Sequence, residues 1–220
     1  MTDRTLEAEL KYEFNLDLDR PSNAHAIQFR MVPQGSRVLD IGCHTGILGE
    51  ALRERKDCRV TGIDSDPEAL VKARDRLAEV AHVDLESSGW ERDAGLQHSG
   101  GFDVILFGDV LEHTRNPIEI LRPAKVLLKP GGRVIVSIPN VVNLRIRLKI
   151  LMGKFEYEDS GILDRTHLRF FTKKSSQAMI RDAGYRIVES DVSGYSLPHR
   201  LIRMFPELLA VQFIAAAVPL

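Results

Sequence analysis

The feature that most constrains the fold is a series of short apolar runs that alternate with helical patterns. Apolar runs of this length, bounded by turn residues, are typical of β-strands. They lie at Arg37–Ile41, Arg59–Ile63, Val80–Val83, Asp103–Phe107 and Arg133–Ile138. Helical periodicity fills the gaps between them, over Gly46–Arg55, Pro67–Leu77 and Asn116–Leu128. Strands that alternate with helices form right-handed β-α-β units and a parallel sheet, and the near-continuous apolar runs indicate that both faces are covered.

The regular alternation of strands and helices ends after the fifth apolar run. The turn Lys129–Gly132 ends the third helix, and a basic amphipathic stretch, Val141–Met152, comes after the fifth strand. The later segments are a polar stretch, a helix and two strand-like runs, at Gly153–Thr166, Lys173–Ala183, Tyr185–Val192 and Leu208–Ala216. These patterns complete a chain of 220 residues, a length that suits one domain.

Bulk properties exclude several classes of protein. A formal net charge of -1 gives no general attraction to nucleic acid, and no segment resembles an RNA-binding module. Cys43 and Cys58 form neither a C-x-x-C pair nor a metal-spaced cluster, which is expected of free thiols in a reducing compartment. The charged N-terminus lacks the apolar stretch of a secretory signal, and the apolar C-terminus is too short to span a bilayer. We therefore expect a cytoplasmic protein without stable membrane insertion.

Acids and glycines gather where the first three strands end. Gly42 and Gly46 follow Asp40 directly, Asp64 ends the second strand, and Asp84 follows the third. Ligands of open parallel sheets bind beyond the carboxyl ends of the strands, where an acid can accept hydrogen bonds from ribose hydroxyls. Three acids would repel a diphosphate, so they favour a nucleoside that carries a cationic or amine group. Turns also favour Asp and Gly for structural reasons, but their joint placement favours a ligand site.

The motifs around these residues carry a resemblance to class I S-adenosylmethionine-dependent methyltransferases. The matching segments are VLDIGCHTG, GID, FDVILFGDVLEHTRNP and LLKPGGRVIVSIPN, which cover Arg37 to Asn140. GILDRTHLRFFT, from Gly161 to Thr172, is similar to a bacterial subgroup often encoded with glycosyltransferases. The resemblance implies an α/β fold with a Rossmann-like, seven-stranded, mostly parallel sheet, helices on both faces and an antiparallel last strand.

The resemblance also implies a division of the chain. We expect an N-terminal helical lid over 1–36, a cofactor-binding core over 37–140, a substrate-side lid over 141–172, and a C-terminal helix with the last two strands over 173–220. In the first segment, Tyr12, Phe14 and His25 would cover the active site and exclude water. An ordinary helix packed on the sheet is the alternative for this segment.

The resemblance implies S-adenosylmethionine as the cofactor and a role for each matching position. The glycine loop would surround the methionine moiety, Asp64 would hold the ribose, Asp84 with Leu85 would meet the adenine, and Gly108–Asp109 would present carbonyls to the amine. The predicted cofactor-binding residues are Asp40, Gly42, Cys43, His44, Gly46, Asp64, Ser65, Asp84, Leu85, Gly108 and Asp109. His44 stands where glycine is commonest; we expect it to be tolerated with a φ below zero, and contact with the substrate is its alternative role.

Methyl transfer to a hydroxyl benefits from a base by roughly 10²–10⁴-fold. Histidine, with an unperturbed pKa of about 6.5, suits this role. We predict a catalytic set of His113, His167 and Asp164, in which Asp164 orients His167 from three residues before it. Structural hydrogen bonds within loops are the alternative explanation for each histidine. No pair has the spacing of a zinc signature, so we predict no metal, although donor atoms are offered by Asp109, Glu112, His113, Asp164 and His167.

The predicted function is methyl transfer to a hydroxyl, with an amine as the second choice, on a small polar metabolite such as a sugar or glycoconjugate precursor. Within Val141–Met152, Leu144, Leu148 and Leu151 lie along one helical face, and Arg145 and Lys149 share another. This helix is either a packed lid or a contact for an anionic, sugar-linked substrate, with a polyprenyl-linked substrate at a membrane surface as a further alternative. A non-catalytic cofactor-binding protein and a nicotinamide-dependent oxidoreductase or nucleotide-sugar epimerase are the competing functions.

Overall fold

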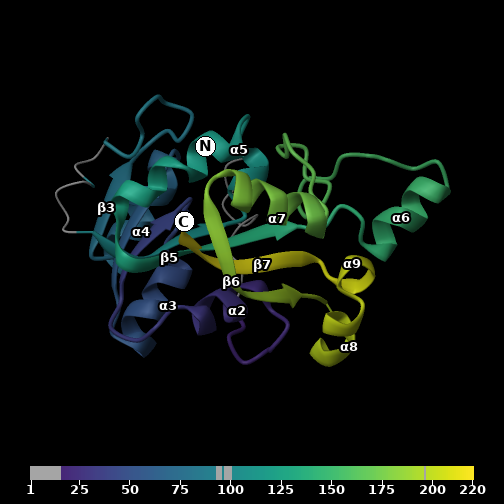
Figure 1. The fold of residues 1–220 in the computed structure, drawn as a ribbon, viewed down its shortest axis with the longest axis horizontal. Coiled ribbons are helices and arrows are strands. Elements are labelled where there is room, and N and C mark those ends of the chain that lie inside the picture. The colour runs from purple at the N-terminus through teal and green to yellow at the C-terminus, as the bar shows by residue number, and fades with distance from the viewer. Residues whose placement is uncertain (1–15, 93–95, 97–100, 196) are drawn as a thin grey trace, which may run out of the picture.

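The described part of the chain forms one seven-stranded sheet with helices on both faces (Figure 1). The computed structural model describes residues 16–92, 96, 101–195 and 197–220. The strands are β1 (Arg37–Ile41), β2 (Arg59–Asp64), β3 (Glu79–His82), β4 (Phe102–Gly108), β5 (Leu128–Pro139), β6 (Tyr185–Ser193) and β7 (Gln212–Pro219). Their order is β3-β2-β1-β4-β5-β7-β6; β7 pairs antiparallel with β5 and β6, and the other pairings are parallel. The predicted fold class is therefore confirmed.

Two groups of helices cover the two faces of the sheet. One group consists of α2 (Ala24–Met31), α3 (Ile47–Lys56) and α4 (Pro67–Arg76), and the other of α5 (Pro117–Leu121), the 3₁₀ helix η3 (Pro123–Leu127) and α7 (Lys173–Asp182). Within β4, Val104 and Leu106 pack toward the first group, whereas Ile105 and Phe107 pack toward the second. This alternation follows from the two-residue period of a strand and produces two apolar cores with the sheet between them.

Shorter helices stand at the carboxyl ends of the parallel strands. The 3₁₀ helix η2 (Leu111–His113) follows β4, α6 (Leu144–Leu151) follows β5, and α8 (His199–Met204) and α9 (Pro206–Leu209) connect β6 to β7. Figure 1 shows α6, α8 and α9 at the same end of the molecule. Across the residues that the structure describes, no helix has the length and apolarity needed to cross a bilayer.

Prolines explain two wrong boundaries. The single helix expected over Asn116–Leu128 is divided at Pro123, because a proline inside a helix removes an N–H donor and clashes with the preceding turn. The predicted start of the last strand, at Leu208, is too early in the sequence. Pro206 instead starts the short helix α9, since proline is well suited to the first helical position.

The turn expected at Lys129–Gly132 lies inside strand β5. Pairing between β4 and β5 passes from Phe102–Leu128 to Val104–Arg133, so four residues of β5 are accommodated opposite one residue of β4. The turn residues therefore form an irregularity within the strand, and β5 begins immediately after η3.

Only part of the expected N-terminal lid lies within the described residues. Tyr12 and Phe14 lie outside the described residues. His25 belongs to α2, which begins after the cap Asn23 and packs Ile27 into the core between the sheet and its first group of helices. The packed helix is thus present, while the lid and the four-part division of the chain stay predictions.

Candidate functional site

The loop after β1 turns sharply at the point where strand order reverses, because β2 lies on one side of β1 and β4 on the other. Gly42 and Gly46 have φ angles of 68° and 78°, in the left-handed region that glycine adopts at low cost. A Cβ atom at Gly42 would lie 2.5 Å from Val110 Cγ2, so only glycine fits there. The amides of Gly42 and Cys43 donate to Ile63 O at 2.8 and 3.1 Å, which ties the loop to β2.

The expectation of a φ below zero at His44 is wrong. Its φ is 47°, a left-handed value that costs a non-glycine residue about 1–3 kcal/mol and persists only where the surroundings impose it. The surroundings include Asp64, whose Oδ2 accepts a hydrogen bond from the His44 backbone amide at 2.7 Å. A contact between β1 and β2 therefore sets a backbone angle that local sequence does not reveal.

Asp40 and Asp64 converge beside this loop. Burial, and secondarily the charge of Asp64, raises the pKa of Asp40 to about 7. Asp64 is half-buried, and its Oδ1 accepts from the amide of Asp66 at 2.9 Å. Each Asp64 oxygen keeps a second lone pair that can accept a bond from a ligand hydroxyl. Burial first, and then both carboxylates, also raises the pKa of the Cys43 thiol, which makes it an inert neighbour of this acidic pair.

The residues predicted to meet the adenosine stand at the next strand ends. Ser65 is exposed, and its carbonyl oxygen lies 3.1 Å from His82 Nε2. Asp84 is exposed and accepts from the Glu86 amide at 2.9 Å, as in a turn. Leu85 is half-buried against the core. These residues follow the carboxyl ends of β2 and β3, and their roles toward the cofactor stay predictions.

The turn after β4 contains a further, half-buried carboxylate. Asp109 has a φ of 55°, and its Oδ1 accepts from Gln212 Nε2 at 2.6 Å and from Ser137 Oγ at 3.4 Å. Burial raises its pKa to about 6, although these two hydrogen bonds act in the opposite direction. A Cβ atom at Gly108 would lie 2.8 Å from Gln28 Oε1. Both amide atoms of Gln28 are buried without a hydrogen-bond partner among the described residues, which suits contact with a ligand.

Sequence reasoning missed Gln28, Ser137 and Gln212. They come from α2, β5 and β7, and only the sheet order brings them to the end of β4. Together these groups fit a small polar cation with hydroxyl groups. They comprise a buried amide without a partner among the described residues, two glycines with no room for a side chain, and three carboxylates.

His113 is held by a chain of hydrogen bonds. Its Nδ1 lies 3.1 Å from Thr166 Oγ1 and 3.3 Å from Thr166 O, and Thr166 Oγ1 donates to Asp164 Oδ1 at 2.7 Å. Since a carbonyl oxygen can only accept, Nδ1 carries the proton in the neutral imidazole, and Nε2 carries the lone pair. Asp164 thus acts on His113 through Thr166, a link across 53 residues that spacing did not reveal.

His167 lies next to this chain. The ring centroids of His113 and His167 are 4.7 Å apart, and the rings meet edge to face. Nδ1 of His167 lies 3.1 Å from Ile162 O, which makes it the donor and again leaves the lone pair on Nε2. The structure therefore brings together the predicted set of His113, His167 and Asp164, while their catalytic roles stay predictions.

Glu112 is buried close to the two imidazoles. It is 1 % exposed, and neither carboxylate oxygen has a hydrogen-bond partner among the described residues. Burial, and then the charges of Asp109 and Asp164, raises its pKa well above the ordinary value. Donor atoms of Glu112, His113 and His167 lie within 4.8 Å of one another, so in the described chain this mixed oxygen and nitrogen set could hold a divalent ion. The expectation of no metal stays a prediction.

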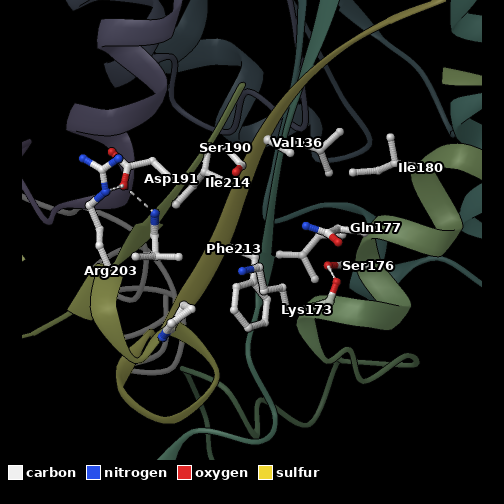
Figure 2. Close-up of a pocket in the computed structure, with 14 residues that line it drawn as sticks. Val136, Lys173, Ser176, Gln177, Ile180, Ser190, Asp191, Arg203, Phe213 and Ile214 are labelled. Carbon is white, nitrogen blue, oxygen red and sulfur yellow. Dashed lines mark hydrogen bonds and ion pairs between the residues drawn. The ribbon is translucent and has the colours of Figure 1, made fainter. Parts of the chain in front are cut away.

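A cavity of about 200 Å³ lies elsewhere, between α7 and the β5-β7-β6 part of the sheet (Figure 2). Its lining includes Lys173, Gln177 and Phe213, and Asp191 pairs there with Arg203 at 3.6 Å. None of the predicted cofactor-binding or catalytic residues lines it. The candidate site therefore lies at the carboxyl ends of β1, β2 and β4, not in this cavity.

Comparisons with known proteins show which proteins the chain is similar to. A family model described as "Methyltransferase domain" matches residues 16–190. Proteins named ubiquinone biosynthesis O-methyltransferase from Xanthomonas axonopodis pv. citri (strain 306) and Xanthomonas campestris pv. campestris (strain B100) are 33% and 32% identical, over 79% and 90% of this chain and 72% and 82% of their own lengths.

Solved structures share the fold at low sequence identity. The CcbJ methyltransferase from Streptomyces caelestis has a TM-score of 0.64 at 16% identity and covers 96% of this chain and 95% of its own. An S-adenosylmethionine-dependent methyltransferase from Mesorhizobium loti has a TM-score of 0.61 at 17% identity, with coverage of 91% and 99%.

Proposed function

Because the chain belongs to the methyltransferase domain family, we propose that it transfers a methyl group from S-adenosylmethionine to a hydroxyl of a small molecule. The protein is a class I S-adenosylmethionine-dependent methyltransferase, and the family sets aside the oxidoreductase, epimerase and non-catalytic alternatives. The hydroxyl acceptor, the link to glycosyltransferase gene clusters and the cytoplasmic location are the proposed parts. An amine acceptor stays the second choice.

Residues at the three strand ends would hold the cofactor. The glycine loop would surround its methionine moiety, Asp64 would accept bonds from the ribose hydroxyls, and Asp84 with Leu85 would meet the adenine. When bound, the cofactor supplies a methyl group on a sulfonium, already activated for displacement. The protein's task is then to orient the acceptor, exclude water and remove one proton.

The observation that carries the hydroxyl acceptor is the hydrogen-bonded series Asp164–Thr166–His113. It fixes the proton on Nδ1, so Nε2 of His113 can accept the proton of an acceptor hydroxyl as its oxygen takes the methyl group. A neutral amine would need no such base. The printed names of the relatives, O-methyltransferases, support the same choice. A sugar or glycoconjugate acceptor remains the narrower proposal, supported by the exposed basic residue Arg145 on α6.

A transfer assay tests the proposed function. We expect methyl-labelled cofactor to label hydroxyl compounds, as detected by mass spectrometry, in a panel of matched sugars, phenols and amines of similar size. Calorimetry on the same preparation should give stoichiometric binding of the cofactor and its demethylated product. Labelling of amines alone would contradict the hydroxyl acceptor and leave the family assignment intact.

The pKa of Asp40 predicts opposite pH trends for stability and for cofactor affinity. An acid with a folded pKa of about 7 and an ordinary value of 3.8 stabilises the cofactor-free fold fully below 3.8 and loses that contribution as pH rises through about 7. Cofactor affinity should rise over the same window, because a sulfonium cation favours the ionised carboxylate. We expect Tm without cofactor to fall and calorimetric affinity to increase from about pH 5 to about pH 8. Asp40→Asn should reduce both trends to the part that Asp109, with its pKa of about 6, contributes, and unchanged trends in this variant would contradict the assignment.

A further inference from the structure

We propose that α6 and the segment after it dock on the surface of a bilayer that contains anionic phospholipids. The docking face consists of the apolar residues Leu144, Leu148, Ile150, Leu151, Met152 and Phe155 and the basic residues Arg145, Arg147, Lys149 and Lys154. This proposal concerns an interaction surface and does not rest on the proposed acceptor.

The apolar residues of the docking face lack a core to pack against. Leu151 is 83% exposed and Met152 is 64% exposed, whereas in α6 only Ile146 is buried, against Ile162 and Leu163. A surface helix of a globular protein ordinarily buries its apolar side. Figure 1 shows α6 projecting away from the sheet. Contiguous exposed apolar surface of this kind marks an interaction site.

The charge of the docking face selects an anionic surface as the occupant. The segment 144–154, LRIRLKILMGK, contains four basic residues and no acid. The acids that follow are exposed: Glu158 pairs with Lys149, Asp159 pairs with Arg165, and Glu156 lies between Phe155 and Tyr157. Each basic residue near an anionic leaflet contributes about 1 kcal/mol, or roughly fivefold in affinity.

The arrangement of apolar residues favours a lipid surface over a protein partner. Leu144, Leu148 and Leu151 share one face of α6, but Ile150 and Met152 are exposed outside this stripe, so the apolar surface is wider than a groove for one helix face would cover. A fluid bilayer accommodates such a shape because it needs no fixed complementary surface. With eight residues, α6 is about 12 Å long, so it would lie in the interface and not span the membrane.

Helix α8 extends the same end of the molecule. Leu201, Met204 and Phe205 are exposed there, beside Arg200. Contacts hold α6 near this region, because Asn143 Nδ2 donates to the carbonyl of Ala210 at 2.8 Å. The two short helices therefore present apolar and basic side chains at one end of the molecule.

A row of aromatic rings connects the docking face with the candidate active site. The ring centroids of Phe155 and Phe170 are 6.1 Å apart, and those of Phe170 and His167 are 6.4 Å apart. Tyr157 lies 6.0 Å from Phe155. Docking through α6 would thus place His113 and His167, the predicted catalytic histidines, close to the membrane surface, where a membrane-partitioned acceptor could reach them.

Vesicle sedimentation tests the docking face. We expect the full chain to sediment with phosphatidylcholine vesicles that contain phosphatidylglycerol, to bind pure phosphatidylcholine much more weakly, and to dissociate at high salt. The double variant Leu151→Glu with Met152→Glu should reduce binding more than about tenfold, because two apolar side chains lose their burial in lipid. Arg147→Gln with Lys154→Gln should reduce binding about 25-fold and weaken the salt dependence.

The matched control is Val71→Glu with Val126→Glu, which changes two exposed apolar residues on α4 and η3 in the same way. It should sediment with anionic vesicles as the unchanged protein does. Calorimetric cofactor binding by every variant establishes that it is folded, independently of methyl transfer. The proposal would be overturned if the control lost as much vesicle binding as the docking-face variants. It would also be overturned if the unchanged chain bound neutral vesicles as strongly as anionic ones, or bound no vesicles. If the unchanged chain forms dimers but does not bind vesicles, and the Leu151→Glu and Met152→Glu changes dissociate those dimers, the docking face would instead be an interface with a second copy.

Discussion

Replacing His113 with asparagine should lower kcat for methyl transfer to a hydroxyl by about 10²–10⁴-fold, the range expected for loss of a positioned general base. Asparagine can keep a hydrogen bond to Thr166 but has no basic nitrogen at the Nε2 position. Cofactor affinity should stay within about twofold, since the predicted cofactor-binding residues lie on the loops after other strands and on the preceding turn. Single-turnover kinetics and calorimetry measure the two effects separately.

Two controls separate this role from structural ones. His199→Asn makes the same change where the imidazole lies 3.0 Å from Val192 O and pairs with Asp191, so kcat should not change. Thr166→Val removes the link between Asp164 and His113 and should alter the pH–rate profile with a smaller loss of kcat. A His113→Asn enzyme that keeps most of its kcat, or loses cofactor affinity instead, would contradict a base role. Activity that disappears in EDTA would point to the donor set of Glu112, His113 and His167 as an ion site.

The sheet was predictable because its signals are local. Each apolar run bounded by turn residues became a strand, and β1 occupies Arg37–Ile41 as expected. The errors arose where distant contacts or single prolines decide the outcome. Pro123 divides a helix whose apolar periodicity looked continuous, and the left-handed backbone of His44 depends on a hydrogen bond to Asp64, which is twenty residues away.

The candidate site was predictable only as far as residue type and strand order specify it. Asp40 and Asp64 follow parallel strands that are neighbours in the sheet, so their convergence could be inferred. Gln28 could not, because it belongs to no motif and reaches the site from α2. Thr166 lies within the matching segment GILDRTHLRFFT, but its contact with His113, 53 residues away, has no local signal. The exposure of Leu151 was also hidden, since a helical pattern with three leucines on one face equally predicts a packed lid.

Asp64→Ala should weaken binding of S-adenosylmethionine by about 100-fold or more. Hydrogen bonds to a charged acceptor contribute about 1.5–3 kcal/mol each, and two ribose hydroxyls would lose such a partner. The same change releases the backbone amide of His44, so the loop that would surround the methionine moiety loses its attachment to β2. Asp64→Asn should have a smaller effect, because one amide oxygen remains as an acceptor. Calorimetric titration of each variant with the cofactor gives the affinities.

Asp66→Ala is the matched control, because Asp66 lies two residues away and caps α4 through the amides of Glu68 and Ala69. It should cost about 1 kcal/mol of stability without changing cofactor affinity. A cofactor analogue without ribose hydroxyls completes the test. It should bind the unchanged protein weakly and lose almost nothing further with Asp64→Ala, because both changes remove the same hydrogen bonds. If the two losses were additive, Asp64 would act only on the loop, and the convergence of carboxylates would not serve the ribose.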